Sequence, residues 1–337
     1  MRVPAKWVAC IALVGTGALA VSGCSAADSA DGGDGQVTID LASSYNDDQP
    51  QNACGAAVIK EVAEAADVGL TVDVYPSSQL GGDTDRVAAI ASGDIDMDIQ
   101  GSSTLAAIYE PISVMDAAYV FDGPEHLAAF VASDDGKQLL DDFEAATGIR
   151  SLGVWSAGAR QFTSNEPISE PADLAGKRMR FPGSPQYLLN AQALGAQPTE
   201  IAYEEVYLAL QQGTADGQEN PITNIDSLNL QEVQDYINLT SHQLTTHHII
   251  IGKVWDELTD EQRAALQDGV DQAVVEEEKC VEEEEAAKIK EWKDSGVWQV
   301  NDDVDVDAFR DQAISWFEDN LTGDKLRVFE SIRATAE

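Results

Sequence analysis

Three short runs of β-branched and aliphatic residues alternate with helical patterns near the start of the chain, and this alternation limits the fold most strongly. Strands are predicted at 37–41, 71–75 and 95–99, with helices at about 52–66 and 83–90 between them. Each helix is long enough to serve as the crossover that parallel strands require. The pattern therefore predicts an α/β fold with a parallel sheet.

The carboxyl ends of these three strands are short, polar and rich in serine. They fall at 42–44, 76–78 and 100–103. In open α/β sheets, ligands bind beyond the carboxyl ends of the strands. Ser44 and Ser102 are therefore candidates for hydrogen bonding to a small polar ligand, although serine-rich turns are also common without a function.

The chain is strongly acidic, with 337 residues and a formal charge of −40. This charge argues against binding to nucleic acid and against docking on anionic lipid. The sequence contains no HExxH, GxSxG, P-loop, GxGxxG or paired CxxC motif. We therefore predict a protein that is not an enzyme and that uses no cofactor. A metal site is not expected either, because adjacent His247 and His248 on a predicted strand would point to opposite faces.

A basic strand stands out in this acidic chain. It runs over 177–181, and Pro182-Gly183 ends it with a turn signal. Alternation places Arg178 and Arg180 on one face of the strand. Arginine is well shaped to hold a carboxylate through two parallel hydrogen bonds, so this strand is a candidate for binding an acid.

Three neighbouring pieces of sequence carry a family resemblance. They read DLAGKRMRFPGS, ALGAQPTEIAYEEVYLALQQGTADGQENP and EVQDYINLTSHQL. In motif and spacing they resemble the solute-binding proteins of TRAP transporters. The resemblance implies a two-lobed periplasmic-binding-protein-like fold, a small organic acid as ligand and TRAP membrane subunits as partners. It leaves open whether the acid is a dicarboxylate, a sugar acid or a keto acid.

The resemblance also assigns the lobes and the ligand-facing residues. Lobe I would comprise 37–157 and about 246–285, and lobe II 158–245 and about 286–337, with the chain crossing between them. Arg180 would pair with the ligand carboxylate, whereas Arg178 would be structural. The remaining expected contacts are a second arginine, an amide, an aromatic wall and two first-lobe serines, namely Arg160, Asn220, Tyr203, Ser44 and Ser102.

The N-terminal segment reads as an export signal. Positive charge at Arg2 and Lys6 precedes an apolar run, and VSGC then resembles the processing box of bacterial lipoproteins. This predicts a signal peptide over 1–23, lipid on Cys24 and a flexible tether over 24–36. The protein would then be extracytoplasmic, anchored to the outer face of the cell membrane.

Two cysteines remain after the signal and the anchor. Cys54 and Cys280 form an even pair in an oxidising compartment. Both a disulfide and two unbridged thiols stay open, because sequence alone does not place their Cα atoms within bridging distance.

One long helix is predicted from Asp260 to Lys293. Thr259 and Gln262 form a capping box at its start, and neither proline nor glycine occurs from 270 to 295. At 1.5 Å per residue it would be about 50 Å long, long enough to cross the back of both lobes. The acidic runs 276–278 and 282–285 are expected to form its solvated face.

Two other functions remain as alternatives. The binding component of an ATP-driven importer shares the broad architecture, but the ADGQENP and KRMRFPGS segments favour the TRAP family. An extracytoplasmic hydrolase with paired acids is the second alternative. Turnover of a bound acid would favour the hydrolase, whereas its unchanged recovery would favour a binding protein.

Overall fold

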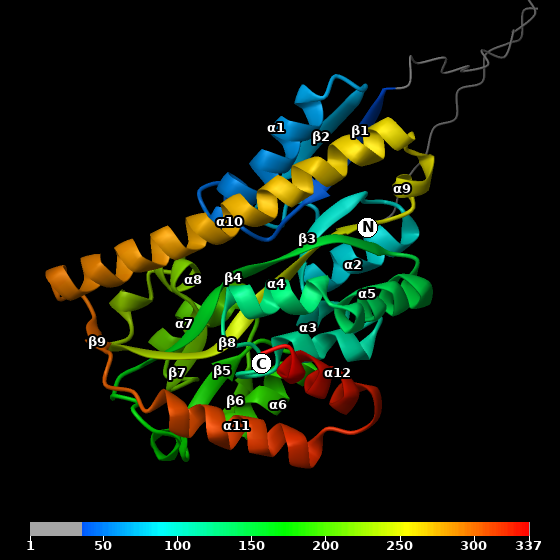
Figure 1. The fold of residues 1–337 in the computed structure, drawn as a ribbon. Helices are drawn as coiled ribbons and strands as arrows, with labels where there is room; N and C mark the ends of the chain where they lie inside the picture. Colours follow the sequence, from blue (N-terminus) through cyan, green and yellow to red (C-terminus); the bar gives the residue numbers. More distant parts are fainter. Residues whose placement is uncertain (1–35, 337) are drawn as a thin grey trace, which may run out of the picture. The chain divides into compact units, whose positions relative to one another are not determined.

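The computed structural model describes residues 36–336 of the chain. Within this range, a single sheet of nine strands runs through the fold (Figure 1). The strands are β1 (Val37–Ala42), β2 (Leu70–Tyr75), β3 (Met97–Gly101), β4 (Arg150–Ser164), β5 (Arg178–Phe181), β6 (Gln197–Glu200), β7 (Gly217–Pro221), β8 (Tyr236–Ile251) and β9 (Gln299–Asn301).

The order of the strands divides the sheet into two halves. It reads β2-β1-β3-β8-β4-β7-β5-β6, and β9 pairs with β8 off this path. β1 is parallel to β2 and β3, and β5 is parallel to β6 and β7, as the predicted crossover helices require. Between these halves, β8 and β4 are antiparallel to each other and to their outer neighbours. The predicted two-lobed α/β fold is confirmed.

The two central strands are much longer than predicted. The run of apolar and β-branched residues in the sequence predicts strands only at 151–155 and 245–251, whereas β4 has 15 residues and β8 has 16. Their added halves carry buried polar side chains, which hide the alternation that marks a strand in sequence. The pairing of β4 with β8 shifts register between Ser156 and Ala159, where Gly158 has a φ of 92°. Glycine tolerates this left-handed conformation without steric cost.

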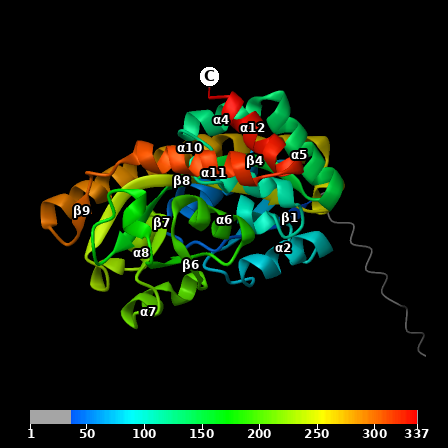
Figure 2. The same cartoon turned by 90° about the horizontal axis from the view of Figure 1, so that it is seen from below.

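Helices cover the sheet and connect its strands. They are α1 (Ala57–Ala65), α2 (Asp83–Ser92), α3 (Ser102–Leu105), α4 (Pro124–Ala132), α5 (Asp134–Thr147), α6 (Pro185–Leu194), α7 (Val206–Gln211), α8 (Ile222–Ser227), α9 (Val254–Glu257), α10 (Asp260–Ser295), α11 (Val306–Asn320) and α12 (Gly323–Ala334). Shorter helical turns are η1 (Gln51–Ala56), η2 (Glu110–Asp116), η3 (Pro171–Leu174), η4 (Tyr203–Glu205) and η5 (Leu230–Glu232). α12 packs against η2 and α5, and Figure 2 shows it beside α5.

The predicted long helix is confirmed as α10. It has 36 residues, and both hydrogen bonds of the capping box between Thr259 and Gln262 are present. α10 contacts α1 and η1, which follow β1, and it contacts α8 and β9 towards its end, so it bridges the two halves of the sheet (Figure 1). Val270 and Ala273 join the core around β1 and β3, whereas Trp292 joins the core around α8.

The expectation that the acidic runs of α10 are solvated is wrong in part. Glu277 is fully buried, Glu278 accepts a hydrogen bond from the backbone N–H of Ser156 at 3.1 Å, and Glu285 has an enclosed Oε1. A helix turns by about 100° per residue, so a run of three or four acids must reach its inner face. Val281 lies one turn from both Glu277 and Glu285 and is itself buried.

Cys54 and Cys280 form a disulfide, which resolves the alternative that the sequence left open. Their Cα atoms lie 6.5 Å apart, although 226 residues separate them along the chain. The bridge ties η1, which follows the first strand, to α10. Such a crosslink stabilises a fold chiefly because it restricts the unfolded chain.

The polar composition of residues 215–221 predicts a loop, but the structure differs. Gly217–Pro221 forms the buried strand β7, between β4 and β5. A Cβ at Gly217 would lie 2.4 Å from the carbonyl oxygen of Thr163, so only glycine fits this close approach of two strands. The polar side chains of β7 face other polar groups rather than solvent, which alternation rules do not anticipate.

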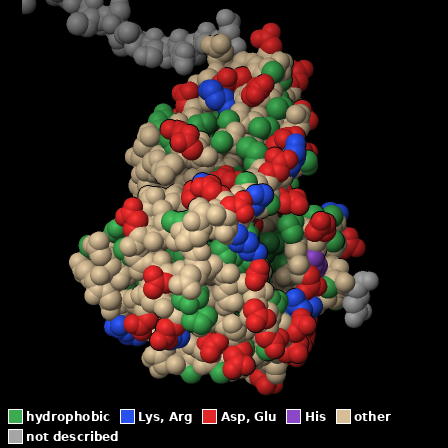
Figure 3. Space-filling model, turned by 90° about the vertical axis from the view of Figure 1, so that its left-hand side faces the viewer, with side chains coloured by type: hydrophobic (Ala, Val, Ile, Leu, Met, Phe, Trp, Pro, Cys, Tyr) green, Lys and Arg blue, Asp and Glu red, His purple; other side chains and the backbone are tan. Residues whose placement is uncertain are grey.

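Acidic side chains are spread over the face of the fold shown in Figure 3. None of the helices in residues 36–336 combines the length and the hydropathy that a membrane crossing needs. The predicted signal peptide, the lipidation at Cys24 and the tether up to residue 35 lie outside the described residues.

Candidate functional site

A cavity of about 770 Å³ lies against residues from both halves of the sheet. One half contributes residues that follow β1 and β3, such as Ser44 and Ser103, together with the start of α2. The other half contributes Arg180 of β5 and Asn220 of β7. The central strands add Arg160, Thr245 and His247. The cavity is thus at the carboxyl ends of the first strands, where the α/β pattern places a ligand.

Arg180 is the buried cation of this cavity that has unused hydrogen-bonding capacity. Its side chain is only 2% exposed, and its Nε donates to the carbonyl oxygen of Ile201 at 2.9 Å. Its Nη1 has no hydrogen-bond partner among the described residues. Burial lowers the pKa of the guanidinium to about 10, although the charge of Glu219 acts in the opposite direction. Arg180 therefore remains charged at neutral pH and gains most from an anion in the cavity.

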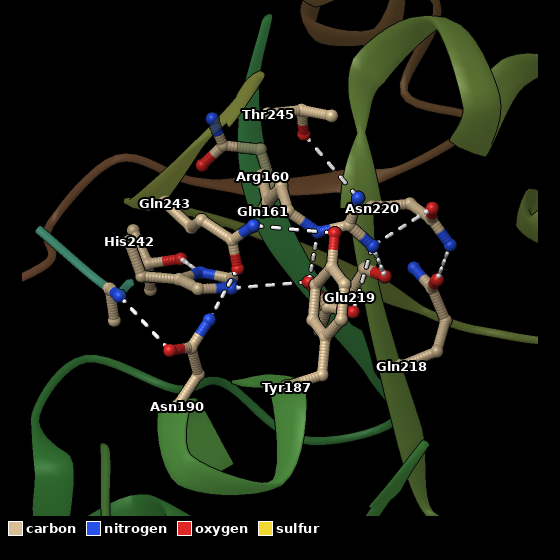
Figure 4. A network of polar contacts seen from close by, with 12 residues as sticks. Arg160, Gln161, Tyr187, Asn190, Gln218, Glu219, Asn220, His242, Gln243 and Thr245 are labelled. Atoms are coloured by element: carbon tan, nitrogen blue, oxygen red, sulfur yellow. Dashed lines mark hydrogen bonds and ion pairs between the residues drawn. The ribbon is translucent and has the colours of Figure 1, made fainter. Parts of the chain in front are cut away.

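Arg160 lies in the same cavity but already has a buried counter-ion. Its Nε and Nη2 both donate to the carboxylate of Glu219, the latter at 2.8 Å (Figure 4). Burial opposes the charge of Arg160, but Glu219 outweighs it and raises the pKa. The guanidinium also lies over the ring of Tyr187, 5.0 Å from its centroid. Arg160 is therefore fixed in position before any ligand binds.

Asn220 connects this ion pair to the next residues of β7. Its Oδ1 accepts a hydrogen bond from Arg160 Nη2 at 3.1 Å, and its Nδ2 donates to Gln218 Oε1 at 2.6 Å (Figure 4). The register of the sheet accounts for this contact, because Asn220 pairs with Gln161, the residue after Arg160. The predicted amide therefore lines the cavity next to the second arginine.

A second layer of buried polar groups supports this arrangement. His242 Nε2 lies 3.5 Å from Glu219 Oε2, and burial lowers the pKa of the imidazole. Asn190 Nδ2 donates to Gln243 Oε1 at 2.7 Å, and Gln243 Nε2 lies 3.3 Å from the hydroxyl of Tyr187 (Figure 4). Linked buried hydrogen bonds of this kind hold side chains in one conformation.

Ser44 and Ser102 have different environments. Ser44 lines the cavity, donates to Asp83 and accepts a hydrogen bond from Arg86 Nη2 at 2.9 Å. Ser102 is not among the cavity-lining residues. It is fully buried, with its Oγ 2.6 Å from Thr246 Oγ1 and 2.8 Å from His248 Nε2. Its neighbour Ser103 lines the cavity instead, because the chain turns into α3 at this point.

Tyr203 and Arg178 differ in their relation to the cavity. Tyr203 is half-buried and lines the cavity, with its hydroxyl 3.3 Å from Ser227 Oγ. Arg178 lies outside the cavity lining and forms an exposed ion pair with Asp216, at 2.6 Å between Nη2 and Oδ1. The structural role expected of Arg178 agrees with this contact.

Sequence reasoning missed several polar residues of the cavity. Asp116 is buried and accepts hydrogen bonds from the backbone N–H of Ser103 at 2.7 Å and from Thr246 Oγ1 at 2.8 Å. The hydroxyl of Tyr45 lies 2.8 Å from His247 Nε2. Burial lowers the pKa of His247 to about 3, so this imidazole is neutral at physiological pH. The position of Tyr45 after a predicted strand was the available signal, whereas none pointed to Asp116.

In the described part of the chain, no cluster of three or more His, Cys, Asp or Glu side chains is arranged to hold a metal ion. The cavity is instead lined by hydroxyl groups, amides and the guanidinium of Arg180, whose Nη1 has no hydrogen-bond partner among these residues. This set is suited to non-covalent binding of a small acid.

Comparisons with known proteins identify the family of this chain. Residues 42–319 match the family described as bacterial extracellular solute-binding protein, family 7. A solute-binding protein of Roseobacter denitrificans is 34% identical over 69% of this chain and 72% of its own length. The C4-dicarboxylate-binding periplasmic protein of Rhodobacter capsulatus is 31% identical over 74% of this chain and 75% of its own.

Solved structures give the same result for the fold. A TRAP periplasmic solute-binding protein from Roseobacter denitrificans, solved with bound L-galactonate, has a TM-score of 0.79 and 29% identity. The match covers 88% of this chain and 98% of that protein.

Proposed function

Because this chain belongs to family 7 of the bacterial extracellular solute-binding proteins, we propose that it captures a small organic acid outside the cytoplasmic membrane for TRAP-type transport. The observation that carries this proposal is the free Nη1 of buried Arg180 in the cavity. A buried donor without a partner is unfavourable, and a ligand carboxylate would supply that partner. The relatives that bind dicarboxylates or sugar acids support the class of ligand.

In this proposal each cavity residue has a distinct role. Arg180 grips the ligand carboxylate, and Asn220 hydrogen-bonds to it. Arg160, held by Glu219, orients Asn220 and adds to the positive potential. Tyr203 forms an aromatic wall, and Ser44 accepts a hydrogen bond, since its own proton is donated to Asp83. Ser102 is left out because it is fully buried and does not line the cavity.

Identifying the ligand tests the proposal that the protein binds an acid and does not convert it. Protein purified without denaturant is unfolded, and the released small molecules are identified by mass spectrometry. We expect an organic acid, recovered unchanged after it is added back and incubated. Release of no acid, together with no thermal stabilisation by any organic acid, would reject the function. Conversion of the acid would favour a hydrolase.

We propose that the two lobes close around the acid. The crossings would lie at residues 157–158 in β4, 245–246 in β8 and about 285–286 in α10. The shifted register near Ser156 and the left-handed Gly158 support a bend at the first crossing. Solution scattering should give a smaller radius of gyration when the acid is bound. Equal radii at saturation would count against closure.

We further propose that lipid on Cys24 anchors the protein to the outer face of the membrane. The VSGC segment after an apolar run supports this assignment. The Cys24→Ser variant should leave the membrane fraction and appear in the soluble extracytoplasmic fraction. A variant that stays with membranes would show that another segment anchors the protein.

A further inference from the structure

The two arginines of the cavity differ in how much charge they can offer to a ligand. Arg160 directs Nε and Nη2 to Glu219 and Nη2 also to Asn220, and its Nη1 lies 3.4 Å from Thr245 Oγ1. Arg180 instead keeps Nη1 free of partners within residues 36–336. The cavity therefore holds one uncompensated cation, which suits one carboxylate.

The start of α2 contributes the opposite charge to the cavity. Asp83 and Asp85 are exposed and both line it. The N-terminus of a helix would by itself favour an anionic group. Here two carboxylates already occupy this first turn, so a ligand anion would meet negative charge instead.

Arg86 is the cation closest to these acids, but it does not neutralise their negative charge. Arg86 pairs with Asp83 at 2.9 Å, but its Nε is also bound by both oxygens of buried Asp98, at 3.1 Å each. Asp85, which also lines the cavity, takes part in no ion pair within the described residues. The wall of the cavity at the start of α2 is thus negatively charged.

The remaining polar groups of this wall are suited to hydroxyl groups. Ser44 and Thr104 each present a hydroxyl, and Asn224 presents an amide. His247 is neutral, and its Nδ1 has no partner among the described residues, so it adds no second positive charge. Neutral donors and acceptors of this kind pair with ligand hydroxyls without requiring a charge.

Building on the proposed function, we propose that the ligand is a polyhydroxylated acid with one carboxylate, and that Asp83 and Asp85 exclude acids with a second carboxylate. Arg180 would hold the carboxylate, while the cavity wall around the start of α2 would form hydrogen bonds with the hydroxyl groups at the other end of the ligand. Carboxylates brought next to Asp83 and Asp85 would be repelled in a partly desolvated cavity. Hydroxyl groups at the same place would instead donate hydrogen bonds to them.

Matched pairs of acids test this selectivity. Galactonate and galactarate differ only in that the terminal CH₂OH of the first is a carboxylate in the second. Erythronate and meso-tartrate form the same pair with four carbons. Calorimetry with the full-length protein should show binding of at least one aldonate, with its aldarate weaker by about tenfold or more. Equal or tighter binding of the aldarate would overturn the proposal, and so would binding of neither series.

Variants at the two ends of α2 test which acids cause the selectivity against aldarates. Asp85→Asn removes one charge from the cavity wall without a large change in shape, so the gap between aldonate and aldarate should narrow several-fold. Asp94→Asn removes the same charge beyond the other end of α2, outside the cavity lining, and should leave the gap unchanged. An unchanged gap in Asp85→Asn, Asp83→Asn and the double variant would assign the selectivity to other residues and overturn the role of these acids.

The same experiment separates this proposal from the proposed function. If the protein binds aldarates as well as aldonates, and Arg180→Ala loses both, acid capture stands and only the single-carboxylate selectivity fails. If neither series binds but an organic acid is released from the purified protein, the substrate class fails alone. If no acid binds or is released, both fail.

Discussion

The inner face of α10 carries a carboxyl group whose titration should be visible in the stability of the protein. Glu285 keeps part of its surface exposed, but its Oε1 is enclosed next to Gly158. Burial raises its pKa from 4.5 to about 8; the backbone amide of Ile222 acts against this shift, and the charge of Glu284 adds to it. Replacing Glu285 with glutamine should remove this titration and keep the shape of the protonated acid.

The expected size follows from the shift in pKa. Between pH 4.5 and about 8 the folded state holds a proton that the unfolded state has lost. The free energy of unfolding therefore falls as pH rises through this window and changes no further above it. A shift of this size corresponds to at most about 5 kcal/mol at about 1.4 kcal/mol per pKa unit. Because part of Glu285 is exposed, solvent screening reduces the expected effect to about 2 kcal/mol.

Denaturant unfolding at several pH values measures this effect. The stability of Glu285→Gln relative to the native protein should rise by about 2 kcal/mol between pH 5 and pH 8.5. Glu282→Gln, on the exposed side of the same helix, removes an equal charge and serves as the control. A difference between Glu285→Gln and the native protein that stays constant with pH would refute the buried position of this carboxyl group.

Two further predictions concern buried contacts. Glu219→Gln removes the counter-ion of buried Arg160, so the free energy of unfolding should fall by about 3–5 kcal/mol; an unchanged denaturation midpoint would mean that Arg160 is compensated elsewhere. The double variant Cys54→Ser and Cys280→Ser should lose about 2–5 kcal/mol in the same assay, and the native protein should lose a similar amount when it is reduced. No effect of reduction on the native protein would indicate that the bridge does not form.

The elements that were predicted correctly are those whose local residue pattern matches the structure they adopt in the fold. The alternation of strands and helices up to residue 101 and the capping box at Thr259 both reappear in the structure. The basic strand was also identified, because Arg178 and Arg180 alternate with apolar residues. Their different environments depend on partners distant in sequence, such as Asp216 for Arg178 and Ile201 for Arg180. No local pattern encodes these contacts.

The errors concern polar residues inside the fold. Periodicity treats glutamate as solvent-facing, so Glu277 and Glu285 were placed outside although they continue a buried stripe. The strand β7 was assigned to a loop because its side chains are polar. Ser102 and Ser103 are indistinguishable in sequence, and only the turn into α3 decides which one lines the cavity. In each case tertiary contacts determine burial.

The affinity of the Arg180→Ala variant for the native acid tests the central claim most directly. Removing one partner of a buried charge pair typically costs about 2–5 kcal/mol, which corresponds to a loss of about 30-fold to several-thousand-fold. Arg178→Ala, two residues away on the same strand but paired with Asp216 at the surface, is the matched control and should bind almost normally. Calorimetry on folded variants is expected to show this contrast. Near-native affinity in Arg180→Ala would contradict carboxylate capture at this arginine.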